Sequence, residues 1–244
     1  MKEEDLIQQG QEPQNHQLLL VGSGRLATHF AFYLRSINYS FHQWSRRTHS
    51  SQELKTLLKS VEHVALAISD DGLAPFIDQN LLGFQGRISH FSGAWHRNGI
   101  VSTHPLMSFG PHLYQLSDYK KIHFTIEGAD SLSRVFPRLE NPWSVLSADR
   151  KSFYHALCVL GGNFPLLLWS KMEKDLRTMG IPTEALHLYI QKISQNYIDS
   201  GEAALTGPLV RGDKQTIERN INALAGDPWE KVYRAFQEVY REHS

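Results

Sequence analysis

The chain has 244 residues, 41% hydrophobic and 20% charged, a balance typical of a globular protein with one large domain or two small ones. Its 25 Lys and Arg residues equal its 25 Asp and Glu residues, so no net charge favours binding to nucleic acid or to an anionic membrane. The single cysteine, Cys158, excludes an internal disulfide, and the absence of an 18-residue apolar run and of a signal-peptide pattern predicts a soluble, cytoplasmic protein.

Strands and helices are expected to alternate in the first part of the chain. Residues 1–16 are polar and rich in Gln and Glu, which predicts a flexible tail. The segments with strand character after it are 18–21, 39–44, 63–69, 87–92, 99–104, 121–128 and 142–147. Apolar residues follow the first strand at helical spacing from Leu26 to Ile37, and a second helical segment spans 51–60. This alternation predicts an α/β domain over residues 17–148, with a doubly wound, mainly parallel Rossmann sheet.

The rest of the chain contains no segment with convincing strand character and begins with a long apolar helix. Asp149 is placed to cap this helix, which is expected to start near Arg150. Gly161, Gly162 and Pro165 lie inside it. They should bend the helix, because proline lacks the N–H group that a helical hydrogen bond needs.

Three further helices complete this part of the chain. They are expected over about 183–199, 213–224 and 228–242. Asp213 precedes the second helix and Asp227 precedes the third, so a carboxylate can cap each first turn. Residues 149–244 therefore predict an all-α domain that follows the α/β domain.

A glycine pair links the first predicted strand to the first helix. Gly22 would allow the tight turn, Gly24 would let the backbone approach a pyrophosphate, and Ala27 would let the helix pack close to the strand. Free N–H groups at the helix N-terminus would meet the phosphates. The alternative for an isolated motif is a plain turn between a strand and a helix. The expected contacts to a dinucleotide in this segment are Gly22, Ser23, Gly24, Arg25 and Leu26.

The end of the second predicted strand decides which dinucleotide fits. An NAD site usually has Asp or Glu about twenty residues after the glycines, whereas this chain has Ser45, Arg46, Arg47 and Thr48. Guanidinium groups and hydroxyls suit a 2′-phosphate, so the pattern favours NADP(H), with a solvated basic loop as the alternative. The missing carboxylate also argues against S-adenosylmethionine. Ser69, at the end of the predicted strand 63–69, is a further cofactor-binding candidate.

Together with "SRRT", "FSGAW", "THPLMSF", "HALCVLGGNFP" and "ALTGPLVRGD", this fingerprint resembles the Rossmann-like proteins of domain-of-unknown-function family 2520. These are relatives of pyrroline-5-carboxylate reductase and of prephenate dehydrogenase. The resemblance implies a Rossmann domain followed by a helical domain like that of 6-phosphogluconate dehydrogenase, and a homodimer formed through the helical domain. It implies no particular substrate.

Ser92 and His104 are candidate catalytic residues. Each closes a predicted strand, and the carboxyl ends of parallel strands are where α/β sheets bind ligands. By resemblance to the prephenate dehydrogenases, Ser92 and His104, which stands before Pro105, fall on positions that face the nicotinamide and the substrate hydroxyl. A neutral histidine can pass a proton to or from the atom that gains or loses hydride. The alternative for His104 is a structural histidine bonded to a backbone carbonyl.

The helical part offers three more candidates. His155, Val159 and Asn163 are spaced to share one helix face. Related hydroxyacid dehydrogenases have a lysine where Val159 stands, which argues against that activity. Asn163 would hold the substrate or satisfy backbone groups at the bend, and His155 would be catalytic or buried and structural. Arg211 would clamp a substrate carboxylate or pair with Asp213 to shape its loop.

The function these residues predict is an NADP(H)-dependent oxidoreductase. Hydride would move between the nicotinamide and a small C=O or C=N substrate in the cleft between the two domains, and the alternative is a non-catalytic NADP(H)-binding sensor or assembly protein. The histidines lack the spacing of a zinc site and have no cysteine partner, so we expect no metal. We likewise expect no nucleic acid and no membrane among its partners.

Overall fold

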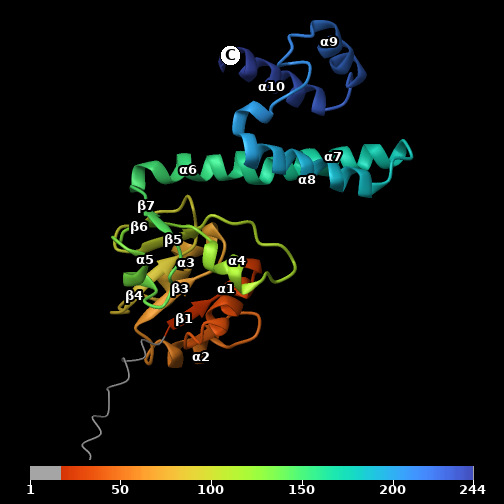
Figure 1. The fold of residues 1–244 in the computed structure, drawn as a ribbon. Coiled ribbons are helices and arrows are strands. Elements are labelled where there is room, and N and C mark those ends of the chain that lie inside the picture. The colour runs from red at the N-terminus through yellow and green to blue at the C-terminus, as the bar shows by residue number, and fades with distance from the viewer. Residues whose placement is uncertain (1–17, 244) are drawn as a thin grey trace, which may run out of the picture. The chain divides into compact units, whose positions relative to one another are not determined.

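The computed structural model describes residues 18–243, so the predicted tail over 1–16 lies outside the described residues. The chain divides into two compact units, one ending at Leu166 and the other beginning at Leu167 (Figure 1). The sequence places a domain boundary at residue 148 instead. The difference is residues 149–166. They include helix α6 (Lys151–Cys158), whose Lys151 side chain is buried and bonds to Ser92 and Ser102 of the first unit.

The described part of the first unit contains one seven-stranded sheet in the order β2-β1-β3-β4-β5-β6-β7. Every adjacent pair is parallel except β5 and β6, which are antiparallel. This confirms the predicted α/β fold. The strands are β1 (Leu18–Val21), β2 (Phe41–Trp44), β3 (His63–Leu66), β4 (Arg87–His90), β5 (Val101–Pro105), β6 (Phe124–Glu127) and β7 (Trp143–Val145). Each lies within a segment that the sequence predicts, except that β5 ends one residue later, at Pro105.

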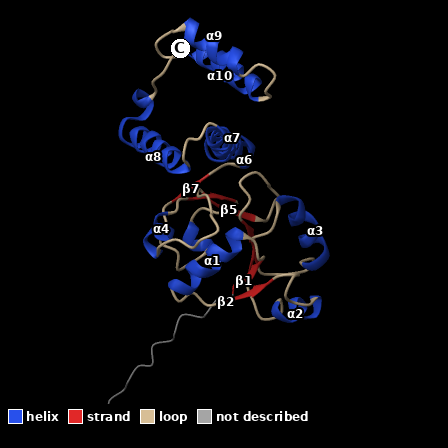
Figure 2. Ribbon diagram, turned by 90° about the vertical axis from the view of Figure 1, so that its right-hand side faces the viewer, coloured by secondary structure: helices blue, strands red, loops and turns tan. Residues whose placement is uncertain are grey.

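Helices cover both faces of this sheet. Figure 2 shows α1 and α4 on one face and α2 and α3 on the other. The helices of this unit before α6 are α1 (Arg25–Ser36), α2 (Ser51–Leu57), α3 (Asp70–Asn80), α4 (Leu116–Lys121) and α5 (Leu132–Val135). The last three were not predicted individually. Because the connections leave β1 toward β2 on one side and toward β3 on the other, a crevice opens beyond the carboxyl ends of these strands.

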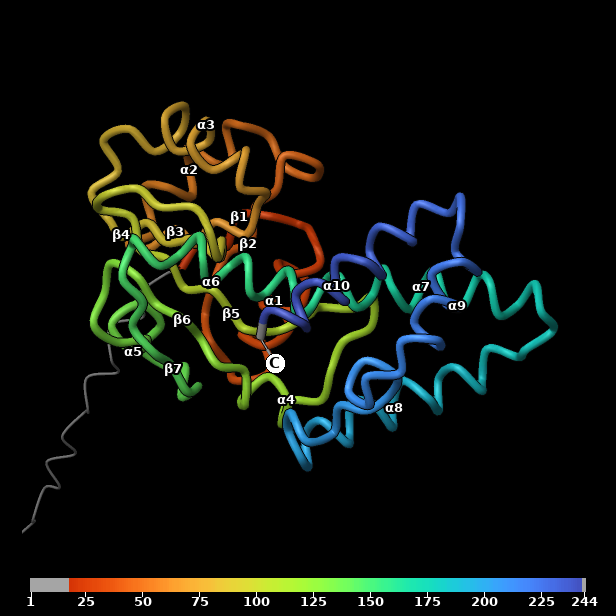
Figure 3. The backbone as a smooth tube through the Cα atoms, turned by 90° about the horizontal axis from the view of Figure 1, so that it is seen from above, coloured from red at the N-terminus to blue at the C-terminus, as the bar shows by residue number. Residues whose placement is uncertain are grey.

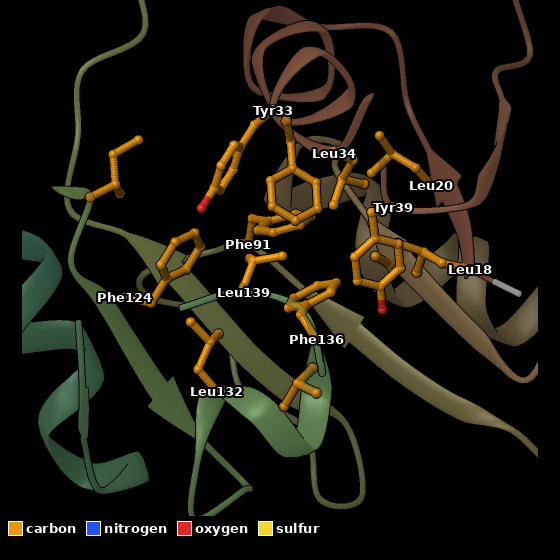
Figure 4. Packing of buried hydrophobic residues seen from close by; sticks show 14 of the residues in the cluster. Leu18, Leu20, Tyr33, Leu34, Tyr39, Phe91, Phe124, Leu132, Phe136 and Leu139 are labelled. Carbon is orange, nitrogen blue, oxygen red and sulfur yellow. The ribbon is translucent and has the colours of Figure 1, made fainter. Parts of the chain in front are cut away.

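Two buried clusters hold the layers together. On the α1 face, Phe30 and Leu34 belong to a cluster with Phe136 and with sheet residues such as Leu18. Figure 4 shows Leu34, Phe136 and Leu18 in this cluster. On the opposite face the cluster includes Leu54, Leu73 and Ile77 of α2 and α3 together with Leu19 and Val64 of the sheet. A strand with alternate residues buried in both clusters is covered on both faces, which explains why β1 is apolar throughout.

The start of the long helix differs from the prediction. Asp149 lies within the short 3₁₀ turn η1 (Ala148–Arg150), and the residue at the N-cap of α6 is Arg150, which makes no side-chain cap bond. A hydrogen bond from Ser147 lowers the pKa of the Asp149 carboxyl, so this carboxylate is used by the turn and not by α6. The prediction that Asp149 caps the helix was therefore wrong.

The predicted irregularity inside the helix is a π-turn. Residues Val159–Asn163 (η2) form it, and helix α7 (Phe164–Thr178) begins at the next residue. The turn contains both glycines, and Pro165 stands just after it. A π-turn widens the helical repeat locally, which accommodates a residue that cannot donate a backbone hydrogen bond.

The second unit consists of helices throughout its described residues. After α7 the chain turns over residues 179–182 and continues into α8 (Thr183–Ser200), as Figure 3 shows. The 3₁₀ turn η3 (Gly201–Ala204), α9 (Lys214–Ala223) and α10 (Trp229–His243) follow. Both predicted caps are confirmed, because the backbone N–H of Thr216 donates to Asp213 at 3.0 Å and that of Trp229 donates to Asp227 at 3.0 Å.

Candidate functional site

The crevice beyond β1 and β3 is a cavity of about 860 Å³ within the first unit. The turns after β1, β2, β3 and β4 line it, together with His104 at the end of β5 and His155 on α6. Cofactor candidates and catalytic candidates from sequence segments far apart in the chain therefore share one cavity. The predicted residues among its lining are Gly22, Ser23, Gly24, Arg25, Leu26, Ser45, Arg46, Arg47, Ser69, Ser92, His104 and His155.

The glycine turn has the geometry that a bound phosphate requires. Gly22 has φ +140°, and a Cβ there would overlap the carbonyl oxygen of Ala67, so no other residue fits without a shift of the backbone. At Gly24 a Cβ would meet nothing within 4 Å, and no side chain caps the helix that starts at Arg25. The first N–H groups of α1 are thus left for a ligand.

The loop after β2 presents both of its guanidinium groups to the cavity. Arg46 and Arg47 are exposed and line it, whereas the neighbouring hydroxyls serve the loop itself. Ser45 is buried, its Oγ lies 3.0 Å from Oγ1 of Thr48, and Thr48 in turn contacts Nδ1 of His49 at 2.9 Å. Thr48 is not among the lining residues, and its hydroxyl contacts groups of its own loop.

Ser92 is buried at the end of the turn after β4, and its hydroxyl is fully engaged. It donates to the Asp70 carboxylate at 2.7 Å and accepts from the backbone N–H groups of Ala94 (3.2 Å) and Trp95 (2.9 Å). Asp70 begins α3 and lines the cavity beside Ser69. This geometry makes Ser92 an anchor that joins two turns of the site. It does not leave the Ser92 hydroxyl free to reach a substrate.

His104 lines the cavity, and one of its ring nitrogens has a partner. Its Nδ1 is 2.8 Å from the hydroxyl of Tyr154 on α6. Burial, with the neighbouring His155 and Lys151 adding to it, lowers the pKa of His104 to about 4. Burial raises the pKa of Tyr154 to about 12. Near neutral pH the imidazole is therefore neutral and the phenol is protonated.

His155 faces His104 across a glycine. The two imidazole rings are nearly perpendicular, with centroids 5.9 Å apart. A methyl group added at Gly93 would lie 2.7 Å from Nδ1 of His155 and 3.2 Å from Nε2 of His104. Nδ1 of His155 is buried and has no hydrogen-bond partner among the described residues. A buried polar atom without a partner beside a cavity is a natural contact for a ligand.

Two predicted site residues lie elsewhere. Asn163 is exposed and does not line the cavity. The π-turn changes the helical repeat between His155 and Asn163, so the regular spacing that placed them on one face does not hold. Arg211 is exposed in the second unit. Its neighbour Asp213 accepts hydrogen bonds from the backbone and hydroxyl of Thr216, so this carboxylate caps α9.

Three residues of the site were missed. Asp70 directly follows the predicted Ser69, and Tyr154 directly precedes the predicted His155. Lys151 stands four residues before His155, one helical turn away, and is buried beside Ser92. Proximity in sequence to a candidate histidine on a predicted helix was the available signal for Lys151 and Tyr154. Among residues 18–243, no group of three His, Cys, Asp or Glu side chains is arranged to hold a metal ion.

The sheet order, the glycine turn and the crevice define the first unit as a Rossmann-like domain. Residues 122–241 match the family described as Domain of unknown function (DUF2520), so the predicted resemblance is confirmed over that stretch. A search of curated proteins finds no match. In the described part of the chain, every helix is too short or too polar to cross a membrane.

Solved structures share the fold over nearly the whole chain. A Bacteroides fragilis protein named as a candidate NADP oxidoreductase has a TM-score of 0.75 at 20% identity, covering 93% of this chain and 98% of its own. A reductive aminase from Aspergillus terreus in complex with NADPH and ethyl levulinate has a TM-score of 0.58 at 14% identity, covering 94% and 93%. A Plasmodium falciparum pyrroline carboxylate reductase with NADP bound has a TM-score of 0.58 at 11% identity, covering 93% and 99%. These likenesses confirm a Rossmann-like domain followed by a helical region.

Proposed function

We propose that the protein is an NADP(H)-dependent oxidoreductase that acts on a small C=O or C=N substrate. The observation that carries this proposal is the cavity of about 860 Å³, which is lined by the glycine turn after β1, by Arg46 and Arg47, and by His104 and His155. The fold is shared with enzymes whose structures contain NADPH or NADP, which supports the same cofactor here. When bound, this cofactor supplies or takes up the hydride.

The residues present fit such a cofactor. The turn at Gly22 and the uncapped start of α1 would hold the pyrophosphate. Arg46 and Arg47 would hold a 2′-phosphate through charge-assisted hydrogen bonds, which a ribose hydroxyl could not match. Ser69 and Asp70, at the start of α3, line the same cavity.

His104 is the residue we assign to the reacting atoms. Because Tyr154 stays protonated and His104 stays neutral, the phenol can donate to Nδ1 and leave the N–H of Nε2 toward Gly93 and the cavity. There it would donate a hydrogen bond to the oxygen or nitrogen of the substrate and so polarise the C=O or C=N bond. The unpartnered Nδ1 of His155 would complete the contacts to the same group.

We also propose that the protein is a homodimer formed through its helical region. Apolar side chains at helical spacing on α8 are exposed, including Tyr189 (54%), Ile193 (43%) and Tyr197 (67%). A second copy of the chain is the occupant that the predicted family resemblance implies, and burying such a stripe would stabilise the pair. Arg211 would then be available to clamp a substrate carboxylate in either copy.

The experiment that tests the function is turnover of NADPH with a panel of small ketones, aldehydes, keto acids and cyclic imines. Turnover is measured as the loss of absorbance of the reduced nicotinamide. Oxidation that depends on substrate and disappears in the His104→Gln variant is the expected result. Tight NADPH binding with no turnover across the panel would favour the sensor or assembly protein. Failure to bind NADPH would overturn both.

A further inference from the structure

Lys151 is a buried cation behind the site that the proposed chemistry does not use. It is the first residue of α6, and its side chain is only 3% exposed. Its ammonium donates to the carbonyl oxygen of Ser92 at 3.3 Å and to the hydroxyl of Ser102, and it lies 4.0 Å from Oε2 of Glu127. Lys151 does not line the cavity, so it acts on the site through these partners.

Three neighbouring strands supply the polar floor under this ammonium. His90 pairs with Ser102 between β4 and β5, and Ser102 pairs with Glu127 between β5 and β6. Paired residues of adjacent strands direct their side chains to the same face of a sheet, so these three form one polar row. Nδ1 of His96 pairs with Oε1 of Glu127 at 3.1 Å, which leaves Oε2 for Lys151.

A lysine is seldom buried, because taking its charge out of water is costly even when a carboxylate is near. An apolar pair would satisfy packing equally well, so the ionic arrangement calls for another explanation. The Ser92 carbonyl belongs to the peptide that leads into Gly93, where a side chain would crowd the rings of both His104 and His155. The ammonium therefore holds the peptide that separates the two histidines.

We propose that Lys151 is a positioning residue, whose ammonium, balanced by Glu127, fixes the peptide between Ser92 and Gly93 and thereby the spacing of His104 and His155. Its importance for catalysis rests on the proposed function, whereas the positioning itself does not. Ser92 also connects this peptide to the start of α3, since its hydroxyl donates to Asp70.

The positioning depends on the charge of Lys151. Burial lowers the pKa of Lys151 to about 8, although Glu127 and Asp70 act in the opposite direction. Raising the pH through 8 would neutralise the amine, weaken its hold on the Ser92 carbonyl and relax the peptide at Gly93. The titratable or charged groups that face Lys151 are Glu127 on β6, Asp70 on α3, His90 on β4 and His104 on β5. His96, in the loop after β4, faces Glu127 in turn.

The test is an NMR titration of the intact protein with labelled histidine rings and glycine amides. In the natural protein the ring signal of His104 and the amide signal of Gly93 should each move with a midpoint near pH 8. His104 itself has finished titrating well below that pH, because its pKa is about 4. In Lys151→Met both inflections should vanish. The matched control is Lys214→Met, which removes an exposed lysine at the first position of α9 and should keep them.

A double variant, Lys151→Met with Glu127→Gln, avoids leaving an unpaired buried carboxylate if the single variant does not fold. Absence of the inflection in the natural protein, or its persistence in either Lys151 variant, would overturn the proposal. Neither signal needs cofactor or substrate, so failure of the oxidoreductase function would leave this result standing. With a substrate in hand, Lys151→Met should lower kcat by at least tenfold and change KM little.

Discussion

The two units of the chain bury their apolar side chains to very different extents. The first unit has two large clusters of buried residues, one on each face of the sheet. Among the described residues of the second unit, the buried hydrophobic side chains are only Leu186, Ile217 and Ile221. Many others there are exposed: Leu167, Met179, Ile181, Leu188, Tyr189, Ile193, Tyr197, Ile198, Leu205, Val210, Phe236 and Val239.

This difference indicates a division of roles. The first unit has the burial that an independent domain needs, and it contains the whole cavity. The second unit has ion pairs that hold its helices, such as Lys171 with Asp175 and Asp227, but little apolar burial. A unit of this kind becomes stable by covering its apolar faces. We therefore expect chemistry to depend on the first unit and assembly on the second.

A substitution in the first unit should change turnover without changing dimer formation. His104→Gln should leave folding, NADPH affinity and dimerisation intact while turnover falls by about a hundredfold or more, the scale typical of losing a general acid or base. His187→Gln, an exposed histidine on α8 in the second unit, is the matched control and should behave like the natural protein. A His104→Gln variant with normal turnover would remove His104 from the mechanism and point to His155.

Dimer formation should depend on residues of the second unit. Ile193→Glu places a charge in the exposed apolar stripe of α8, and in a symmetric dimer the change acts twice. Losing about 1.5 kcal/mol or more of apolar burial per copy predicts roughly a hundredfold weaker dimer, measured by analytical ultracentrifugation. Gln191→Glu, an exposed polar position on the same helix, should have no such effect. If the natural protein is a monomer at micromolar concentration, the dimer proposal is wrong.

Cofactor preference should again depend only on the first unit. Replacing Arg46 and Arg47 together with alanine removes charge-assisted bonds of about 1.5–3 kcal/mol each. NADPH affinity should fall at least tenfold, NADH affinity should change little, and Arg219→Ala on α9 should change neither. Fluorescence titration of the reduced nicotinamide measures all three. Equal affinities of the natural protein for NADPH and NADH would contradict the assignment of these arginines.

The fold could be predicted from the sequence because its signals are local. Apolar runs such as Leu18–Val21 identify buried strands, and Gly22 is required by a backbone angle and a close approach that no other residue tolerates. The caps Asp213 and Asp227 act on N–H groups two or three residues away. Each of these rules involves neighbours in the chain.

The site could be predicted only in part, because its remaining contacts join distant segments. Lys151 looks like an exposed helix residue until β5 and β6 supply Ser102 and Glu127. Tyr154 gains its role from His104, fifty residues earlier. Asn163 lies outside the cavity for a different reason, since the regular helical repeat does not extend across residues that form a π-turn. Sheet packing and helix irregularity were the missing information.

Acid stability gives a further test, and it too separates the two units. Burial lowers the pKa of His63 and of His90 to about 3 and that of His104 to about 4, and all three lie in the first unit. Between these values and the ordinary histidine pKa near 6.5, the unfolded chain binds more protons than the folded one, so stability falls as pH falls below 6.5.

The urea concentration at which the first unit is half unfolded should therefore be lower at pH 5 than at pH 7. Hydrogen exchange or tryptophan fluorescence can monitor the unfolding. His63→Gln can keep the hydrogen bond with Ser89, which is 2.7 Å long in the natural protein, and should remove part of this pH dependence. His187→Gln, in the second unit, should leave it unchanged. A midpoint that does not move between pH 7 and pH 5 would mean that these imidazoles are not held neutral by burial. The argument that His104 meets its substrate as a neutral hydrogen-bond donor would then fail with it.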